Sequence, residues 1–147
     1  MDKCKLKVKL IHPEGEVPHY AHETDSGLDL VSLTDLLIKP GERKNVRTGI
    51  AIELPNGYEA QVRSRSGLAL RQGIIVLNSP GTIDEGYHGE IFVLLANLGS
   101  EDFCVEKGMR IAQLVISPVV RPEIIKFEGD FAISTRNDKG FGSSGLK

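Results

Sequence analysis

The chain has 147 residues, a size typical of one domain with its own buried core. Charged residues make up 26% of it and hydrophobic residues 40%, as in an ordinary globular protein. The formal net charge of -2 excludes the strongly basic surface with which proteins bind nucleic-acid polymers, so any phosphate must be recognised by a few placed arginines. No apolar run approaches the ~18 residues of a membrane span, and the first residues do not resemble a signal peptide. The two isolated cysteines, Cys4 and Cys104, favour reduced thiols in the cytoplasm over a disulfide framework.

The first predicted element is a strand at residues 5–10, where lysines alternate with Leu6, Val8 and Leu10. Because successive side chains of a strand point to opposite faces, this segment has one apolar and one charged face. The lysines indicate a place at a sheet edge, where they discourage further pairing. No His-x-x-x-His or Cys-x-x-Cys spacing occurs in the sequence, so a structural metal site is not expected.

Three further strands are predicted before residue 63. One lies in residues 36–41, which end in a Pro-Gly turn, and one covers residues 46–54 with apolar residues at period two. The Pro-Asn-Gly segment at residues 55–57 is predicted to close a hairpin with a third strand, in which Tyr58, Ala60 and Val62 continue the alternation.

That strand leads into a basic segment, Arg63-Ser64-Arg65-Ser66-Gly67. A guanidinium, a hydroxyl and backbone N–H groups near Gly67 suit phosphate oxygens, and one short helical turn is predicted at residues 68–71. Arg63 and Arg65 are expected on one face of the strand, since residues i and i+2 share a face. The alternative interpretation is a solvated basic turn without a ligand.

The sequence is organised around residues 78–90, Asn-Ser-Pro-Gly-Thr-Ile-Asp-Glu-Gly-Tyr-His-Gly-Glu, which lie between the apolar runs 74–77 and 91–95. Two strands joined by about a dozen residues with an aspartate and a tyrosine indicate a hairpin that holds a small molecule. Its glycines let the backbone approach such a molecule closely. The alternative is an ordinary long β-loop. In either case we expect three side chains to face the solvent, those of Glu85, His88 and Glu90.

The last third of the chain changes character. A turn at residues 99–102 and a short strand at 103–105 precede residues 107–115, whose apolar side chains predict a buried strand. Residues 128–147 are polar, rich in Gly and Ser, and not expected to hold a fixed structure alone. We therefore predict a β domain at residues 1–127 and a flexible C-terminal arm at 128–147. About ten short strands with almost no helix signal favour an all-β, jelly-roll-like fold.

Five segments resemble, in order, the five motifs of the trimeric dUTP pyrophosphatases (dUTPases): residues 25–31, 65–67, 78–90, 107–115 and 136–145. The first departs from the usual Ala-Gly-Tyr-Asp-Leu at Ser26 and Leu28. The last resembles Arg-Gly-x-Gly-Gly-Phe-Gly-Ser-Thr-Gly but has Asn137 and Lys139 in place of glycines. The resemblance implies the jelly-roll-like β-clip fold and hydrolysis of dUTP to dUMP and pyrophosphate. That reaction keeps uracil out of DNA and supplies dUMP for dTMP synthesis.

The resemblance also implies a role for each motif residue. Asp84 would activate the attacking water, and Asp29 would hold Mg²⁺ through water. Tyr87 would pack against the deoxyribose and leave no room for a 2′-hydroxyl, and Arg110 would make ion pairs at subunit contacts. The other substrate contacts would be Arg65, Ser66, Gly67 and Gln113 on the phosphates, Asn78, Gly81, Thr82 and Ile83 on uracil, Arg136 on the terminal phosphate, Phe141 stacked on uracil, and Gly142, Ser143 and Ser144 around the phosphate chain.

The same resemblance implies a homotrimer with shared sites and no nucleic-acid polymer or membrane as partner. One subunit would supply Arg65, Ser66 and Gln113, a second Asp84, and a third the Phe141 arm. Two alternatives are weighed against dUTP hydrolysis. The dCTP deaminases share the fold but need a catalytic Glu where this chain has Leu94, and a leucine cannot carry protons. A non-catalytic, nucleotide-gated regulator is disfavoured because no inserted partner-binding domain is visible and Asp84 is intact.

Overall fold

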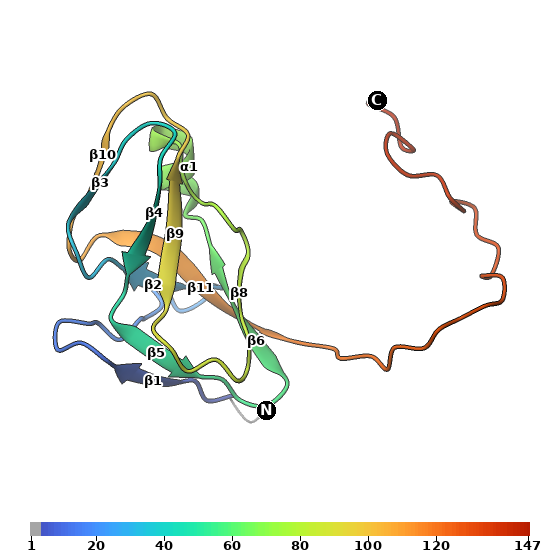
Figure 1. Cartoon of the computed structure of the whole chain (residues 1–147), viewed down its shortest axis with the longest axis horizontal. Coiled ribbons are helices and arrows are strands. Elements are labelled where there is room, and N and C mark those ends of the chain that lie inside the picture. The colour runs from blue at the N-terminus through green and yellow to red at the C-terminus, as the bar shows by residue number, and fades with distance from the viewer. Residues whose placement is uncertain (1–3) are drawn as a thin grey trace.

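The computed structural model describes residues 4–147, and in that range it has eleven strands and one short helix (Figure 1). The prediction of an all-β domain is confirmed. In chain order the elements are β1 (Lys7–Leu10), β2 (Leu28–Val31), β3 (Leu36–Ile38), β4 (Arg43–Arg47), β5 (Ile50–Glu53), β6 (Tyr58–Arg63), α1 (Ser66–Gln72), β7 (Ile74–Val76), β8 (Gly81–Ile83), β9 (Phe92–Asn97), β10 (Phe103–Val105) and β11 (Arg110–Pro118).

The strands form four small antiparallel sheets. The largest has the order β2-β11-β6-β8, the next has the order β4-β9-β7, and the remaining strands pair as β1-β5 and β10-β3. β11 is the central long strand, and its register places Gln113 opposite Asp29 of β2 on one side and opposite Arg63 of β6 on the other. This row joins segments that are far apart in the sequence.

A single hydrophobic core lies between the sheets. Alternate residues of the strands supply it, and Leu30, Ile38, Val93, Leu95 and Leu114 are each 1% exposed or less. Fully burying one such side chain contributes about 1.5–3 kcal/mol. Three polar residues, Ser32, Thr48 and Asn97, are also buried, and the Asn97 amide donates to the carbonyls of Ile38 and Glu101, at 2.9 and 2.8 Å.

Two predictions about the strands before residue 63 are wrong. Residues 46–54 form two strands because the chain breaks at Gly49, whose φ of +72° is a conformation that glycine adopts without strain. The turn at residues 55–57 closes no hairpin, since β5 pairs with β1 while β6 pairs with β11 and β8. Alternation of apolar residues reports which face is buried but not which strand lies alongside.

The hairpin predicted around residues 78–90 is present. β7 and β9 pair antiparallel, with Ile75 opposite Ala96, and the loop between them contributes the additional strand β8 to the largest sheet. The helical turn expected at 68–71 is the middle of α1, which ends at Gly73 with φ +69°. The predicted edge strand is also confirmed, because β1 pairs only with β5 among the described strands.

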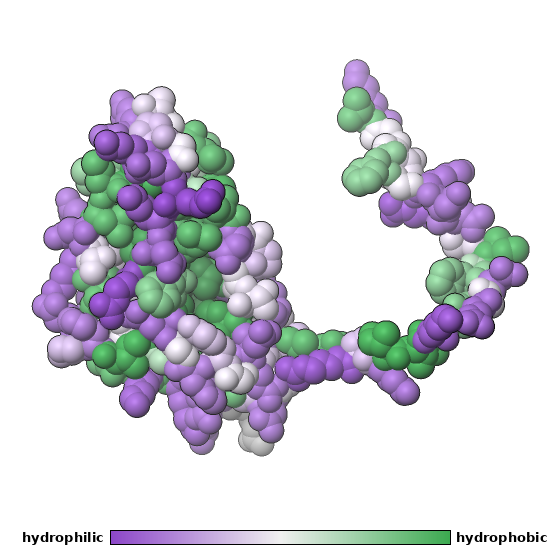
Figure 2. Space-filling model, in the orientation of Figure 1, coloured by the Kyte–Doolittle hydropathy of each residue, from purple (hydrophilic) through white to green (hydrophobic). Residues whose placement is uncertain are grey.

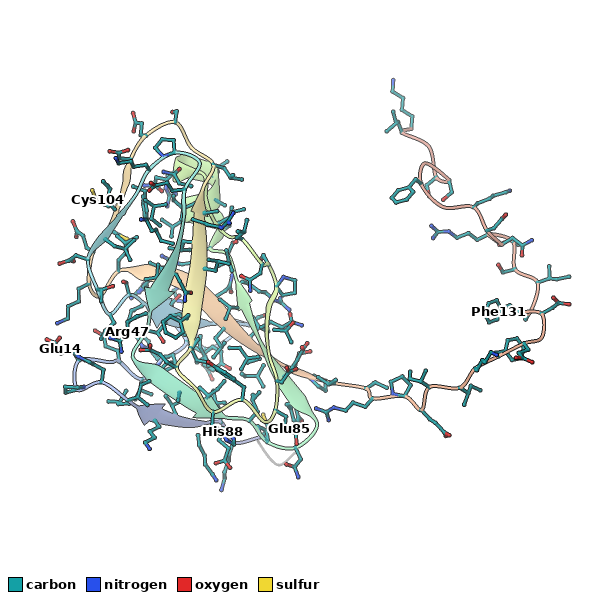
Figure 3. All side chains as sticks on the ribbon, viewed as in Figure 1. Glu14, Arg47, Glu85, His88, Cys104 and Phe131 are labelled. Carbon is teal, nitrogen blue, oxygen red and sulfur yellow. The ribbon has the colours of Figure 1, made fainter. Side chains whose placement is uncertain are left out.

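The C-terminal arm leaves the body after β11. Residues 119–147, all of them described, contain no helix or strand, residues 120–147 are exposed, and the segment runs away from the sheets (Figure 1). Figure 2 shows apolar groups along the first part of the arm, where Ile124, Ile125 and Phe127 are exposed. Figure 3 places Phe131 far from the body. The division at residue 128 stays a prediction. The seven-residue α1 is too short to cross a membrane, and the described part of the chain has no longer helix.

Candidate functional site

The first candidate cavity, here called the arginine cavity, lies at the end of the β2-β11-β6 row. Three of the five motif-like segments meet there, because β11 pairs with both β2 and β6. Its volume is about 380 Å³, and its lining is mostly polar. The lining residues are Asp25, Ser26, Gly27, Asp29, Arg65, Ser66, Gly67 and Gln113.

An acid and two arginines set the geometry of the arginine cavity. The Asp29 carboxylate, 13% exposed, lies 4.0 Å from Arg65 Nε and 3.6 Å from Arg110 Nε. Arg65 also donates from Nη1 to the Arg110 carbonyl at 3.0 Å, which fixes its guanidinium and leaves further N–H groups for an anion. Arg110, expected at subunit contacts, therefore pairs with Asp29 of its own chain.

Gln113 lies in the centre of the row, and a backbone carbonyl holds its side-chain amide. Its Nε2 donates to the Ser64 carbonyl at 3.0 Å, and since an amide nitrogen carries two hydrogens, one remains for a ligand. Gly27 lies against the same side chain, where a Cβ would collide with Gln113 Oε1. The expectation that Arg63 and Arg65 share a strand face is wrong, because β6 ends at Arg63. The guanidinium of Arg63 instead donates to Gln61.

The charges that line the arginine cavity do not by themselves suit a polyphosphate. Asp25 and Asp29 supply two negative charges and Arg65 one positive charge. Among the described residues, no group of three or more His, Cys, Asp or Glu side chains could hold a metal ion. A Mg²⁺ ion fits here only if a bound phosphate supplies most of its oxygen ligands, as Mg²⁺ sites commonly require.

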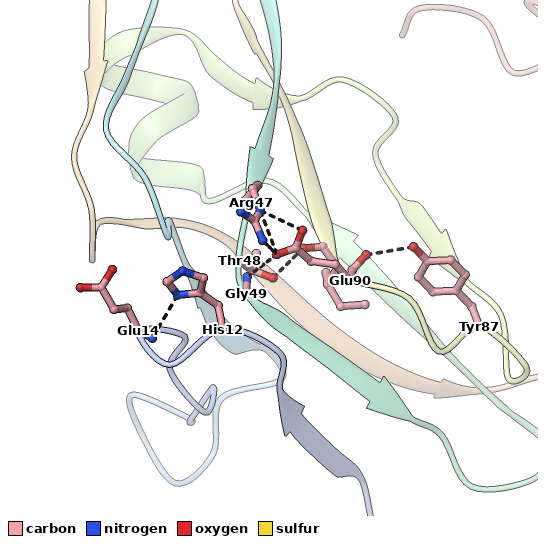
Figure 4. Close-up of polar contacts among 8 residues, drawn as sticks. His12, Glu14, Arg47, Thr48, Gly49, Tyr87 and Glu90 are labelled. Atoms are coloured by element: carbon pink, nitrogen blue, oxygen red, sulfur yellow. Dashed lines mark hydrogen bonds and ion pairs between the residues drawn. The ribbon is translucent and has the colours of Figure 1, made fainter.

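The second candidate cavity, here called the hairpin cavity, has a volume of 230 Å³ and lies in the loop between β8 and β9. Asp84 and Tyr87 form a turn in which the Tyr87 N–H donates to the Asp84 carbonyl at 3.0 Å. The Tyr87 hydroxyl donates to the Glu90 carbonyl at 2.9 Å (Figure 4). The lining residues are Thr82, Ile83, Asp84, Tyr87, Glu90, Ile91 and Phe92. Asn78 is exposed in the segment between β7 and β8, next to Gly81.

The two cavities are separate within one chain and have no described lining residue in common. β8 runs antiparallel to β6, and Ile83 pairs with Ala60, five residues before Arg65. At ~3.4 Å per residue, the three residues from Ala60 to the end of β6 at Arg63 span about 10 Å, and Arg65 lies beyond that end. One chain therefore does not bring Asp84 and Arg65 together.

The expectation that three side chains of this loop face the solvent holds for the exposed His88 and fails for Glu90. The Glu90 side chain is 9% exposed and pairs with Arg47 at 3.0 Å. Glu85 is intermediate: it accepts the Gly57 N–H at 2.9 Å and pairs with Arg121 at 3.0 Å (Figure 3 labels Glu85 and His88). The Gly57 N–H and then Arg121 lower the pKa of Glu85. Arg47 and Arg121 lie far from Glu90 and Glu85 in the sequence, so no local sequence pattern predicts these two ion pairs.

The arm residues lie in neither cavity of this chain. Arg136 Nε donates to the Lys139 carbonyl at 3.0 Å, and Asn137 has the left-handed φ of +49° that asparagine tolerates. Phe141 is fully exposed. Gly142, Ser143 and Ser144 are exposed as well.

Comparisons with known proteins agree on one family. A family model described as dUTPase matches residues 13–145. The deoxyuridine 5'-triphosphate nucleotidohydrolase of Clostridium kluyveri is 56% identical over 141 residues, which cover 96% of this chain and 98% of that protein. The corresponding protein of Clostridium tetani is 50% identical over 145 residues, which cover 99% of each chain.

Solved structures give the same result. A variant dUTPase of Staphylococcus bacteriophage 80alpha with dUpNHpp has a TM-score of 0.87 at 32% identity, covering 97% of this chain and 99% of that chain. A variant dUTPase from phage phi11 of S. aureus, described with a structural Mg(II) ion, has a TM-score of 0.80 at 26% identity, covering 85% of this chain and 97% of that chain. This likeness confirms the jelly-roll-like fold.

Proposed function

The chain belongs to the dUTPase family, and on this premise we propose that it hydrolyses dUTP to dUMP and pyrophosphate. The observation that carries the proposal is the meeting of Asp29, Arg65 and Gln113 in one polar cavity, with Asp84 in a second. The reaction removes dUTP, which keeps uracil out of DNA, and supplies dUMP for dTMP synthesis.

The arginine cavity would bind the phosphates. Arg65, Ser66, Gly67 and Gln113 offer guanidinium, hydroxyl, backbone and amide donors that suit phosphate oxygens. Because two aspartates offset Arg65 there, a triphosphate needs more positive charge. Arg136 of the arm and Mg²⁺, held through water by Asp29, would supply it. When bound, Mg²⁺ neutralises phosphate charge.

The hairpin would read the base and the sugar. β8 is the end strand of its sheet among the described strands, so backbone groups on its outer edge have no strand partner and can pair with the uracil edge. The residues in question are Gly81, Thr82 and Ile83, with Asn78 beside them. The Tyr87 ring would pack on the deoxyribose and exclude a 2′-hydroxyl.

Asp84 would act as the general base. Its exposed carboxylate would take a proton from water, the water oxygen would form a bond to the α-phosphorus, and the bond from that phosphorus to the bridging oxygen would break to release pyrophosphate. Arg65 and Arg136 would stabilise the charge on the phosphates, since positioning and electrostatics dominate phosphoryl transfer.

The separation of the two cavities supports a homotrimer with shared sites. One subunit would supply Arg65, Ser66 and Gln113, a second would supply Asp84, and a third would supply the arm. In the arm, Phe141 would stack on uracil, and the adjoining Gly142, Ser143 and Ser144 would wrap the phosphates. A closed ring of heterologous contacts permits such sharing. We place the protein in the cytoplasm, a proposal supported by the free thiols of Cys4 and Cys104.

The test is pyrophosphate release from dUTP with Mg²⁺, compared with dCTP and dTTP. We expect dUTP to be preferred over dCTP by ~10⁴ in kcat/KM, because a buried site that pairs with one base edge rejects mismatched donors and acceptors. Equal turnover of dUTP and dCTP, or none of dUTP, would contradict the proposal.

A further inference from the structure

The loop that carries Asp84 and Tyr87 is fixed at its far end by a nearly buried carboxylate. Glu90 accepts from Arg47 Nε at 3.1 and 3.0 Å, from Arg47 Nη2 at 3.0 Å and from the Gly49 N–H at 3.0 Å (Figure 4). Two-pronged pairing of this kind fixes orientation as well as position. The Glu90 side chain is 9% exposed, so it makes these contacts largely out of water.

The backbone of the same residue holds Tyr87. The Glu90 carbonyl accepts the Tyr87 hydroxyl at 2.9 Å. The ring lies across Gly89, where a Cβ would come within 2.6 Å of the hydroxyl oxygen. Since Tyr87 is 46% exposed, little packing encloses the ring, and this hydrogen bond is its main restraint.

We propose that Glu90, held by Arg47 and the Gly49 N–H, is a positioning residue that sets the angle of the Tyr87 ring and thereby the preference for deoxyribose over ribose. The inference rests on the proposed function, in which Tyr87 faces the sugar. Arg47 is not among the residues that line the hairpin cavity, so its effect on selectivity passes through Glu90 and Tyr87.

The test measures kcat/KM for dUTP and for UTP in the full-length protein and four variants. Arg47→Met removes the paired charge but keeps an apolar stem, and Tyr87→Phe removes only the hydroxyl. Each variant should lower the ratio of kcat/KM for dUTP to kcat/KM for UTP about fivefold, which is the effect of losing one hydrogen bond. In the double variant Arg47→Met should add nothing further, because both changes release the same ring. Lys7→Met, which removes the exposed Lys7–Glu53 pair, is the matched control and should leave the ratio unchanged.

Thermal unfolding midpoints of all variants separate selectivity from stability. If Arg47→Met lowers turnover of dUTP and UTP equally, the role of Arg47 is structural and the inference is overturned while the proposed function stands. If Arg47→Met does not fold, an unchanged ratio in Tyr87→Phe overturns it equally. Absence of dUTP hydrolysis in the parent protein would overturn the proposed function itself.

Discussion

Shared sites predict that two inactive chains can restore each other. Arg65→Ala removes the guanidinium that we propose binds phosphate in the arginine cavity, and Asp84→Ala removes the carboxylate of the hairpin cavity. Ile83, next to Asp84, pairs with Ala60, which lies about 10 Å before the end of β6 at ~3.4 Å per residue, and Arg65 lies beyond that end. We therefore propose that a site using both residues takes them from different subunits.

The magnitude follows from counting intact donors. If a fraction x of the chains carries Asp84→Ala, the donor of Arg65 is intact with probability x and the donor of Asp84 with probability 1 − x. Activity of randomly mixed trimers should follow x(1 − x), with a maximum of about one quarter of the parental value at equal amounts. A chain ended after Glu128, mixed with Asp84→Ala, should give the same curve for the arm.

The assay is pyrophosphate release after the two variants are unfolded together and refolded at several ratios. Arg65→Ala mixed with Ser66→Ala is the matched control, because both changes affect the same half of the site and should restore nothing. Mass measurement of the intact assemblies verifies that mixed trimers form. Background activity at every ratio, with mixed trimers present, would refute the shared-site reasoning.

Three further predictions concern single residues. Asp84→Asn should nearly abolish turnover while the Kd for dUTP, measured by calorimetry with a slowly hydrolysed analogue as control, changes less than about tenfold. Asn97→Ala should lower the free energy of unfolding, measured in urea, by ~3 kcal/mol, because the buried amide makes three hydrogen bonds, to Ile38, Glu101 and Gly99. The control is Asn45→Ala at an exposed position, which should change the free energy of unfolding by less than ~0.5 kcal/mol. The lowered pKa of Glu85 stabilises the folded state above its ordinary value of 4.5, and this contribution is lost as the pH falls through the lowered pKa. The melting temperature should therefore fall less on acidification for Glu85→Gln than for the parent, and equal falls would contradict this assignment.

Most local features of this protein follow from its amino-acid sequence alone. Period-two alternation predicted most strands, and Gly73 ends α1 in the left-handed conformation that glycine favours. The motif-like segments contain most of the residues that line both cavities, and their roles in recognising phosphate and base stay a prediction. The polar, glycine-rich composition of residues 128–147 likewise predicted a segment without strands or helices.

Which of these segments meet depends on how the whole chain folds. The row of Asp29, Gln113 and Arg63 depends on the register of β11 with two strands, and the Arg47–Glu90 pair joins residues 43 apart. The hairpin predicted at residues 55–57 failed for the same reason. A local pattern reports which face of a strand is buried, whereas the choice of partner and register depends on the apolar surface that the whole chain buries together.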